Sequence, residues 1–329
     1  MPRSTKTGRK STAKNYTRFL TARLARRISV AISAFMQLPA FFASCGTETP
    51  AAVARLRIDR QSSGGSALDV FVFEAETPFL LDSYQQFHAG EEPVYAVSGL
   101  GKKRVVAVTS TSGDLYARAS VTRYQDLAKE SFSLLDDSPA APFCHGETIV
   151  GEGNTGSVNL TLKPLLSSIR LRSVSCNFSG RSYEGDGFHN DNLLLINVVS
   201  ESCPLGAEGG RPVSWLNYGF QTSSHPYLKA DGLGDIGPGR TYCNVLLYCY
   251  PNPEGSPPTR LVLEGTVGDT RCYYPINLPV VKSGTRLALD VTIRRMGTSD
   301  PDSEALPGTF TVEFTSEPWY ERETAIETF

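Results

Sequence analysis

The sequence is poor in the residues that carry most metal and acid–base chemistry. It has four histidines and two tryptophans among 329 residues. It contains no GxSxG, HExxH or P-loop motif. Cys144 and His145 are adjacent, but no second Cys or His lies at metal-ligand spacing from them, and neighbours on a strand point to opposite faces. We therefore expect no catalytic activity, no metal site and no cofactor.

The glycine pattern at residues 151–156 resembles a nucleotide-binding motif. Residues 151–156 read GEGNTG, which matches GxGxxG. That motif needs a helix N-terminus after it, so that backbone amides meet a pyrophosphate. Residues 158–162 instead alternate between apolar and polar side chains, which is typical of a strand. We interpret the glycines as part of a β-turn.

Acidic residues dominate once the N-terminal segment is set aside. Residues 1–44 contain nine Lys and Arg and no Asp or Glu, whereas the whole chain has 32 basic and 34 acidic residues. The remainder thus carries 23 basic and 34 acidic residues, a formal charge of −11. An acidic chain of this kind is not expected to bind nucleic acid.

The first apolar run has the form of an export signal. Residues 28–44 carry no charge and follow a basic segment. At 17 residues, with a Gln and a Pro inside, the run is short for a membrane span, which needs ~20 apolar residues. Cys45 follows Phe42-Ala43-Ser44 directly, which resembles the lipobox of bacterial lipoproteins. We predict that residues 1–44 are a signal peptide and that Cys45 is acylated; a plain signal peptide and a short anchor are the alternatives.

Six cysteines remain after Cys45. They allow 15 disulfide connectivities in an exported protein. Cys243 and Cys249 have the same strand parity, and Cys272 lies two strand-like runs later. We predict a disulfide between Cys272 and one of those two; the alternative is buried free thiols, because Cys is among the most buried residue types.

The rest of the chain is dominated by a two-residue period with frequent Gly and Pro turns. One helix is predicted, at 122–135, and residues 203–240 are expected to be irregular because of their many Gly and Pro. The pattern favours an all-β sandwich fold. A break near Pro164 predicts domains at 45–163 and 164–329. The expected strands are 53–59, 68–73, 93–97, 103–109, 158–162, 168–174, 193–199, 242–250, 260–266, 271–278, 286–295 and 308–315.

The order of these elements resembles that of a known family. The likeness rests on the lipobox-like Cys45 and on an ordered set of runs, among them LDVFVF at 68–73, VNLTLKP at 158–164, YCYPN at 248–252 and YYPINL at 273–278. The chain resembles the fimbrillins of Bacteroidales, the subunits and accessory proteins of type V pili. The resemblance implies two transthyretin-like, Greek-key β-sandwich domains in a lipoprotein of the outer membrane.

The resemblance also implies a way of assembly with other fimbrial subunits. In that family a protease cuts after an Arg between the first two strands, and a C-terminal strand of the next subunit fills the groove. Arg60, at the start of a Gly/Ser loop, is our predicted cleavage site, and we expect the groove beside residues 68–73. The predicted donor is 308–315, with Phe310, Val312 and Phe314 on one face.

A second hypothesis remains open at the sequence level. A surface lipoprotein could bind glycan or a host protein through the 203–240 loops, where Trp215, Phe220 and two tyrosines interleave with Gly and Pro. An aromatic side chain in such a protein is more often part of the core, so the fimbrial hypothesis leads.

Overall fold

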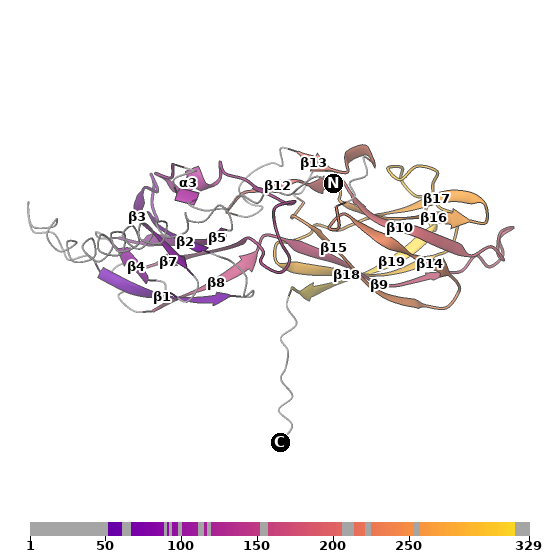
Figure 1. Ribbon diagram of the computed structural model, residues 1–329, viewed down its shortest axis with the longest axis horizontal. Helices are drawn as coiled ribbons and strands as arrows, with labels where there is room; N and C mark the ends of the chain where they lie inside the picture. The colour runs from indigo at the N-terminus through magenta and orange to yellow at the C-terminus, as the bar shows by residue number, and fades with distance from the viewer. Residues whose placement is uncertain are drawn as a thin grey trace, which may run out of the picture. The chain divides into compact units, whose positions relative to one another are not determined.

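The computed structural model is built almost entirely of β-strands (Figure 1). It describes residues 52–60, 67–88, 91, 94–97, 101–110, 115–116, 120–151, 157–205, 214–220, 225–252 and 257–319. The described residues belong to one compact unit. The prediction of an all-β sandwich fold is confirmed.

The first sheet has seven strands in the order β3-β2-β5-β7-β8-β1-β4. Strand β2 is buried on both faces: Leu68, Val70 and Val72 belong to one apolar cluster, whereas Phe71 and Phe73 belong to another. Such a run of consecutive apolar residues is typical of a strand covered on both sides. The strands are β1 (Ala52–Arg60), β2 (Ala67–Glu74), β3 (Leu81–His88), β4 (Val94–Val97), β5 (Lys103–Ser110), β7 (Cys144–Val150) and β8 (Val158–Pro164).

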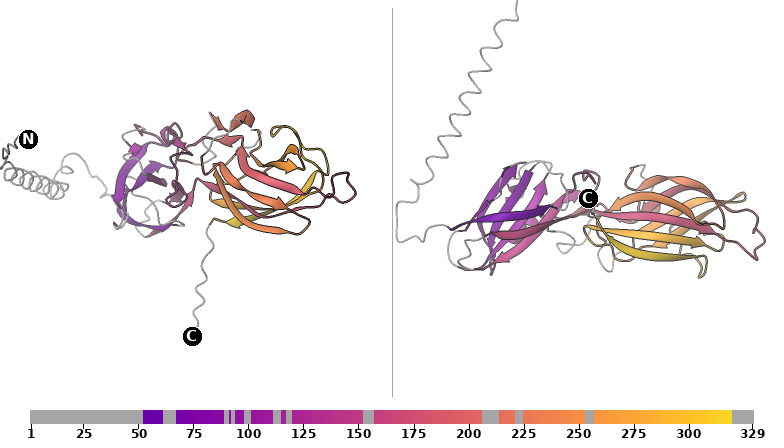
Figure 2. Two further views of the ribbon diagram at one scale, coloured as in Figure 1. Left: turned by 45° about the vertical axis from the view of Figure 1, so that its right-hand side comes forward. Right: turned by 90° about the horizontal axis from the view of Figure 1, so that it is seen from below.

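Two four-stranded sheets follow and pack face to face (Figure 2). One has the order β14-β10-β16-β17 and the other β15-β9-β18-β19. In β18 the residues Leu287, Leu289 and Val291 are buried, as expected of alternate positions on a strand with one covered face. The strands are β9 (Ser167–Cys176), β10 (Phe188–Ile196), β14 (Lys229–Ile236), β15 (Thr241–Cys249), β16 (Arg260–Val267), β17 (Thr270–Asn277), β18 (Thr285–Ile293) and β19 (Phe310–Pro318).

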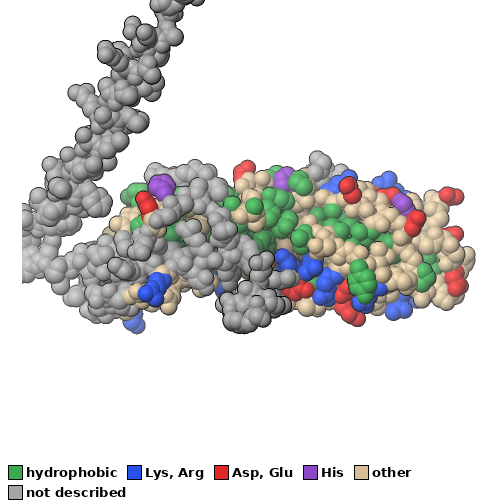
Figure 3. All heavy atoms as spheres, turned by 60° about the horizontal axis from the view of Figure 1, so that its bottom comes forward, with side chains coloured by type: hydrophobic (Ala, Val, Ile, Leu, Met, Phe, Trp, Pro, Cys, Tyr) green, Lys and Arg blue, Asp and Glu red, His purple; other side chains and the backbone are tan. Residues whose placement is uncertain are grey.

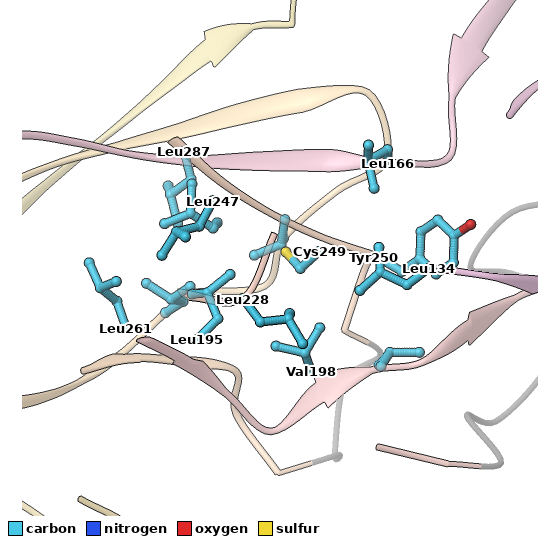
Figure 4. Close-up of a cluster of buried hydrophobic side chains, with 14 of the residues drawn as sticks. Leu134, Leu166, Leu195, Val198, Leu228, Leu247, Cys249, Tyr250, Leu261 and Leu287 are labelled. Carbon is cyan, nitrogen blue, oxygen red and sulfur yellow. The ribbon is translucent and has the colours of Figure 1, made fainter. Parts of the chain in front are cut away.

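One buried cluster includes residues from both halves of the chain. Figure 4 shows Leu134 beside Tyr250, with Leu166 and Leu247 in the same cluster. Two short strands connect the same regions, because β6 (Phe132–Ser133) pairs with β12 (Glu201–Ser202). The segment after β6 therefore packs against residues more than sixty positions later in the sequence.

Two predictions about secondary structure are wrong. The helix expected at 122–135 is a single turn, α3 (Tyr124–Leu127), and the following residues form β6 and turns. The segment 203–240 is not irregular throughout, because it contains β14, the short strand β13 (Trp215–Leu216), which pairs with β11 (Val198–Val199), and the 3-10 turn η2 (Tyr218–Phe220). The division into domains at 163/164 stays a prediction; β8 ends at Pro164 and β9 begins at Ser167.

Candidate strand-exchange site

The predicted donor segment is an edge strand in this structure. β19 pairs with β18 along its whole length, from Ile293 opposite Phe310 to Thr285 opposite Pro318. No other strand among the described residues pairs with the outer edge of β19. That edge therefore offers backbone N–H and C=O groups in the geometry that another strand can bind.

The three predicted donor side chains lie on one face of β19. Phe310 and Val312 are half-buried and Phe314 is 41% exposed. The Phe310 ring packs edge-on against the Tyr274 ring, with ring centres 6.5 Å apart. The structure thus confirms that these side chains share one face, while their role as donors stays a prediction.

An apolar groove lies between the edge strands β17 and β19. It has a volume of about 280 Å³ and is lined by apolar side chains with a few polar ones at its side. β17 and β19 are edge strands of the two four-stranded sheets. The groove therefore opens along the side of the sandwich that these two sheets form, the second sandwich. The lining residues are Pro275, Ile276, Asn277, Glu304, Ala305, Phe310, Val312 and Phe314.

The first strand lies inside its sheet (Figure 1). The first part of β1 pairs antiparallel with β4, from Ala52 opposite Val97 to Arg55 opposite Val94. The second part pairs in parallel with β8, ending with Arg60 opposite Leu162. Arg60 is thus the last residue of β1 rather than the start of the loop, and residues 61–66 lie outside the described part of the chain.

Because β1 lies in this position, the prediction of a groove beside residues 68–73 is wrong. β2 pairs with β3 and β5, so removal of β1 would not uncover residues 68–73 in the sheet. It would leave the edges of β8 and β4 without a partner. The period-two pattern could not show these neighbours, because pairing partners are set by the whole fold. That a donor strand would bind beside β8 is a prediction.

A network of ion pairs crosses the outer face of the sheet that contains β19. The Arg172 guanidinium lies 2.6 Å from an Asp290 carboxylate oxygen and 3.3 Å from one of Glu317. The Arg170 guanidinium lies 3.5 Å from the other Glu317 oxygen and donates a 2.8 Å hydrogen bond to Asn244. Basic and acidic side chains stand side by side on the face drawn in Figure 3. Sequence analysis missed this network, although the alternation of Arg170 and Arg172 with apolar residues places both on one strand face.

The predicted disulfide is not formed. Cys243, Cys249 and Cys272 are free thiols, with Cys243 and Cys249 on β15 and Cys272 on β17 in the other sheet. The Cys243 thiol donates to the carbonyl oxygen of Leu171 at 3.2 Å. Burial raises the pKa of Cys243 to about 11 and that of Cys249 to about 12, which favours the protonated thiol at neutral pH.

The other features considered in the sequence are a metal site, a membrane span, the acylated cysteine and the glycine motif. In that part of the chain no group of His, Cys, Asp and Glu could hold a metal ion, and no helix there is long and apolar enough to cross a membrane. Cys45 lies outside it. The residues after the GxGxxG match form β8 instead of a helix, so that match does not have the surroundings a pyrophosphate site needs.

Comparison with known proteins identifies the fold. No family model and no curated protein sequence matches the chain. Among solved structures, a candidate cell adhesion protein of Bacteroides eggerthii has a TM-score of 0.63 at 21% identity, over 83% of this chain and 98% of that one. The fimbrilin FimA of Porphyromonas gingivalis has a TM-score of 0.56 at 14% identity, over 82% and 97%. The tip fimbrial protein Mfa3 of the same species has a TM-score of 0.50 at 12% identity, over 81% and 100%.

These matches define the fold as that of β-sandwich fimbrial and adhesion proteins. Each covers most of both chains, so the likeness extends over nearly the whole described part of this one. The predicted resemblance to the Bacteroidales fimbrillins is confirmed at the level of the fold. None of these three proteins is described as an enzyme.

Proposed function

We propose that this chain is a structural or accessory subunit of a cell-surface fimbria, exported as a lipoprotein of the outer membrane and joined to other fimbrial subunits by strand exchange. The observation that carries the proposal is the fold shared with the fimbrilin FimA over 82% of the chain. A shared fold alone does not assign a function. The strand neighbours of β1 and the edge position of β19 give the physical reason for proposing strand exchange.

Loss of β1 would create an acceptor. Five residues of β8, from Val158 to Leu162, pair with β1, and four residues of β4 pair with it on the other side. Without β1, these two strands would have unpaired edges, which is costly in water and favours binding of another strand. Val158, Leu160 and Leu162 are buried in the apolar cluster of the first sheet, so an entering strand with alternating apolar residues suits this position.

β19 has the properties of a donor for that position. Among the described strands it is an edge strand held by one neighbour, and Phe310, Val312 and Phe314 lie on one face at two-residue spacing. Each such side chain contributes ~1.5–3 kcal/mol when fully buried. Because Phe314 is 41% exposed in the subunit itself, its transfer into a neighbour would bury further apolar surface.

Mass spectrometry of the N-terminus of the surface-exposed protein tests this proposal. We expect an acylated Cys45 in the membrane-bound precursor and an N-terminus at Gln61 in the assembled form, which corresponds to a cut after Arg60. In a Cys45→Ala variant the precursor should lose its acyl group and leave the membrane fraction. Retention of that variant in the membrane without any lipid would contradict the lipoprotein part of the proposal.

The alternative, a lipoprotein that binds glycan or host protein through 203–240, has less surface to support it. Residues 229–236 form a strand of the second sandwich, and Leu228 is fully buried. One aromatic side chain of the described part of this segment is well exposed, Tyr218 at 57%. Binding of the mature monomer to a glycan array, lost in Tyr218→Ala, would favour this alternative.

A further inference from the structure

We propose that the ion-pair network on β9, β18 and β19 is a latch that holds β19 in its own subunit until exchange. The latch consists of Arg170 and Arg172 on β9, Asp290 on β18 and Glu317 on β19. The inference rests on the proposed strand exchange and concerns its regulation. It assigns to these four side chains a part in the timing of assembly.

The latch connects β19 to a strand that is not its neighbour. β18 lies between β9 and β19 in the sheet, and β19 forms its ladder with β18 alone among the described strands. The two Arg side chains nevertheless reach Glu317 from β9, at 3.3 and 3.5 Å. Release of β19 therefore requires the loss of these contacts in addition to the ladder with β18.

The β18 residue beneath the two Arg side chains that reach Glu317 is small. Ala288 of β18 lies opposite Arg170 on one side and Thr315 on the other. It is completely buried, although it lies on the outer face between Leu287 and Leu289, which belong to the core. A methyl group there leaves room for long side chains to pass over β18, and these side chains cover it.

Further polar contacts fix the geometry of the latch. Arg172 donates a 3.1 Å hydrogen bond to the Thr315 hydroxyl, which adds a second contact with β19. Although burial raises the pKa of Asp290, hydrogen bonds from Ser173 and Arg172 outweigh it and hold that pKa below its usual value. Asp290 is therefore ionised at neutral pH and orients Arg172 toward β19.

The end of β19 is held by one more cation. The Arg286 guanidinium of β18 donates a 3.2 Å hydrogen bond to the carbonyl oxygen of Trp319, directly after the strand. Glu317 lies opposite Arg286 in the ladder. The polar contacts thus concentrate on the C-terminal half of β19, while the apolar groove lies beside its N-terminal half. Opening at the C-terminal end is the step that the latch slows.

Hydrogen exchange of peptide 310–318 in the purified full chain tests the latch, with Glu317→Gln as the variant. Gln keeps the shape of Glu and removes the charge that both Arg side chains bind. Partly exposed ion pairs contribute modestly to stability, so exchange should be about threefold to tenfold faster. Glu313→Gln, an exposed position on the same strand, is the matched control and should not accelerate exchange.

A second measurement uses salt. Raising NaCl from about 0.05 M to about 0.5 M screens exposed and half-exposed charges, so it should accelerate exchange of 310–318 in the wild type and much less in Glu317→Gln. Equal exchange in wild type, Glu317→Gln and Glu313→Gln, with no effect of salt, would overturn the latch.

Measuring the formation of multimers tests the latch and the proposed function separately. After trimming by an arginine-specific protease, Glu317→Gln should form multimers sooner than the wild type and Glu313→Gln. If exchange is faster in Glu317→Gln but no variant multimerises on the cell or in solution, the proposed function fails while the ion pairs still restrain β19. If the wild type multimerises and Glu317→Gln does so at the same rate, the latch is refuted and the proposed function stands.

Discussion

Two glycines of the second sandwich are required because backbones approach each other closely. A Cβ on Gly232 of β14 would lie 2.0 Å from the carbonyl oxygen of Asn190, and a Cβ on Gly265 of β16 would lie 1.9 Å from that of His189. Both carbonyls belong to β10, next to the irregularity between Asn190 and Asn192. Glycine on each neighbouring strand therefore makes room for the distorted part of β10.

Gly232→Ala should lower the free energy of unfolding by about 1–3 kcal/mol, because a side chain forced into occupied space shifts the backbone around it. The measurement is urea unfolding of the purified protein. Gly239→Ala is the control, because a Cβ there meets nothing within 4 Å and should change stability little. Equal midpoints for the two variants would contradict this account of the β10–β14 contact.

Asp137 is a buried acid that joins two distant parts of the sequence. It is 3% exposed and accepts hydrogen bonds from the backbone N–H groups of Ser138 and Phe143 and from the Tyr250 hydroxyl. Burial outweighs these hydrogen bonds and raises its pKa from the ordinary value of 3.8 to about 6. Folding therefore favours the protonated form of this carboxyl group.

Stability should depend on pH through Asp137. Because its pKa is higher in the folded protein, its contribution is fully present below pH 3.8 and is lost as the pH rises through 6. The loss is about 2–3 kcal/mol. Urea unfolding measured from pH 3.8 through pH 6 to neutral pH should show this loss of unfolding free energy in the wild type. It should not show it in Asp137→Asn. Parallel pH profiles for the two proteins would show that Asp137 does not titrate in this range.

At the scale of elements, β19 has two faces with different partners. Phe310, Val312 and Phe314 line the apolar groove, whereas Thr315 and Glu317 contact Arg172 on the other face. The alternation of the sequence predicts this division, because successive strand residues point to opposite sides. A carboxylate on the groove face should thus prevent assembly, whereas one on the other face, away from Thr315 and Glu317, should not.

Val312→Asp combined with Phe314→Asp should abolish assembly and leave export intact, because two carboxylates cannot enter an apolar acceptor without a large cost. The measurement is the ladder of multimers on the cell surface, with the amount of exported protein alongside. Thr311→Asp adds a carboxylate to the opposite face, away from the residues that contact Arg172, and is the control. Assembly that survives the first double change would exclude β19 as the donor.

The sequence predicts most strands but not those that depend on tertiary contacts. Runs such as 158–162 and 308–315 alternate regularly; the first lies within β8, and the second coincides with β19 from Phe310 onward. β14 was missed because Gly232 and Gly234 read as a loop, whereas Gly232 is needed for close packing against β10. The expected helix at 122–135 fails since Phe132 and Ser133 pair with residues 201–202. Long-range pairing of this kind leaves no local pattern.

The candidate site was predictable only in part, because alternation along one strand is local whereas pairing partners are distant in the sequence. The face of β19 follows from its own alternation, so Phe310, Val312 and Phe314 were correctly grouped. The neighbour of β1 depends on the order of strands in the sheet, and β8 is about a hundred residues away in the sequence. The ion pairs to Glu317 likewise join residues 145 and 147 positions apart.

At the scale of the whole molecule, the two candidate strands occupy different sheets. β1 belongs to the seven-stranded sheet and β19 to the sheet with β9 and β18. β8, the partner of β1, is followed almost directly by β9. In an exchanged assembly, a strand received beside β8 would thus be connected through consecutive strands to the sheet that donates β19. Each subunit would be joined to the next in one repeated direction, an arrangement that extends into a filament when the repeat does not close into a ring.

Disulfide trapping between β8 and β19 of different subunits tests this account most directly. Asn159 and Thr161 are exposed on β8 and pair with β1, and Glu313 is exposed on β19. In cells expressing Glu313→Cys together with Asn159→Cys or Thr161→Cys, we expect a ladder of disulfide-linked multimers that collapses on reduction and is absent from the single variants. Surface filaments that form normally, without a linked ladder from either pair, would contradict strand exchange between β19 and β8.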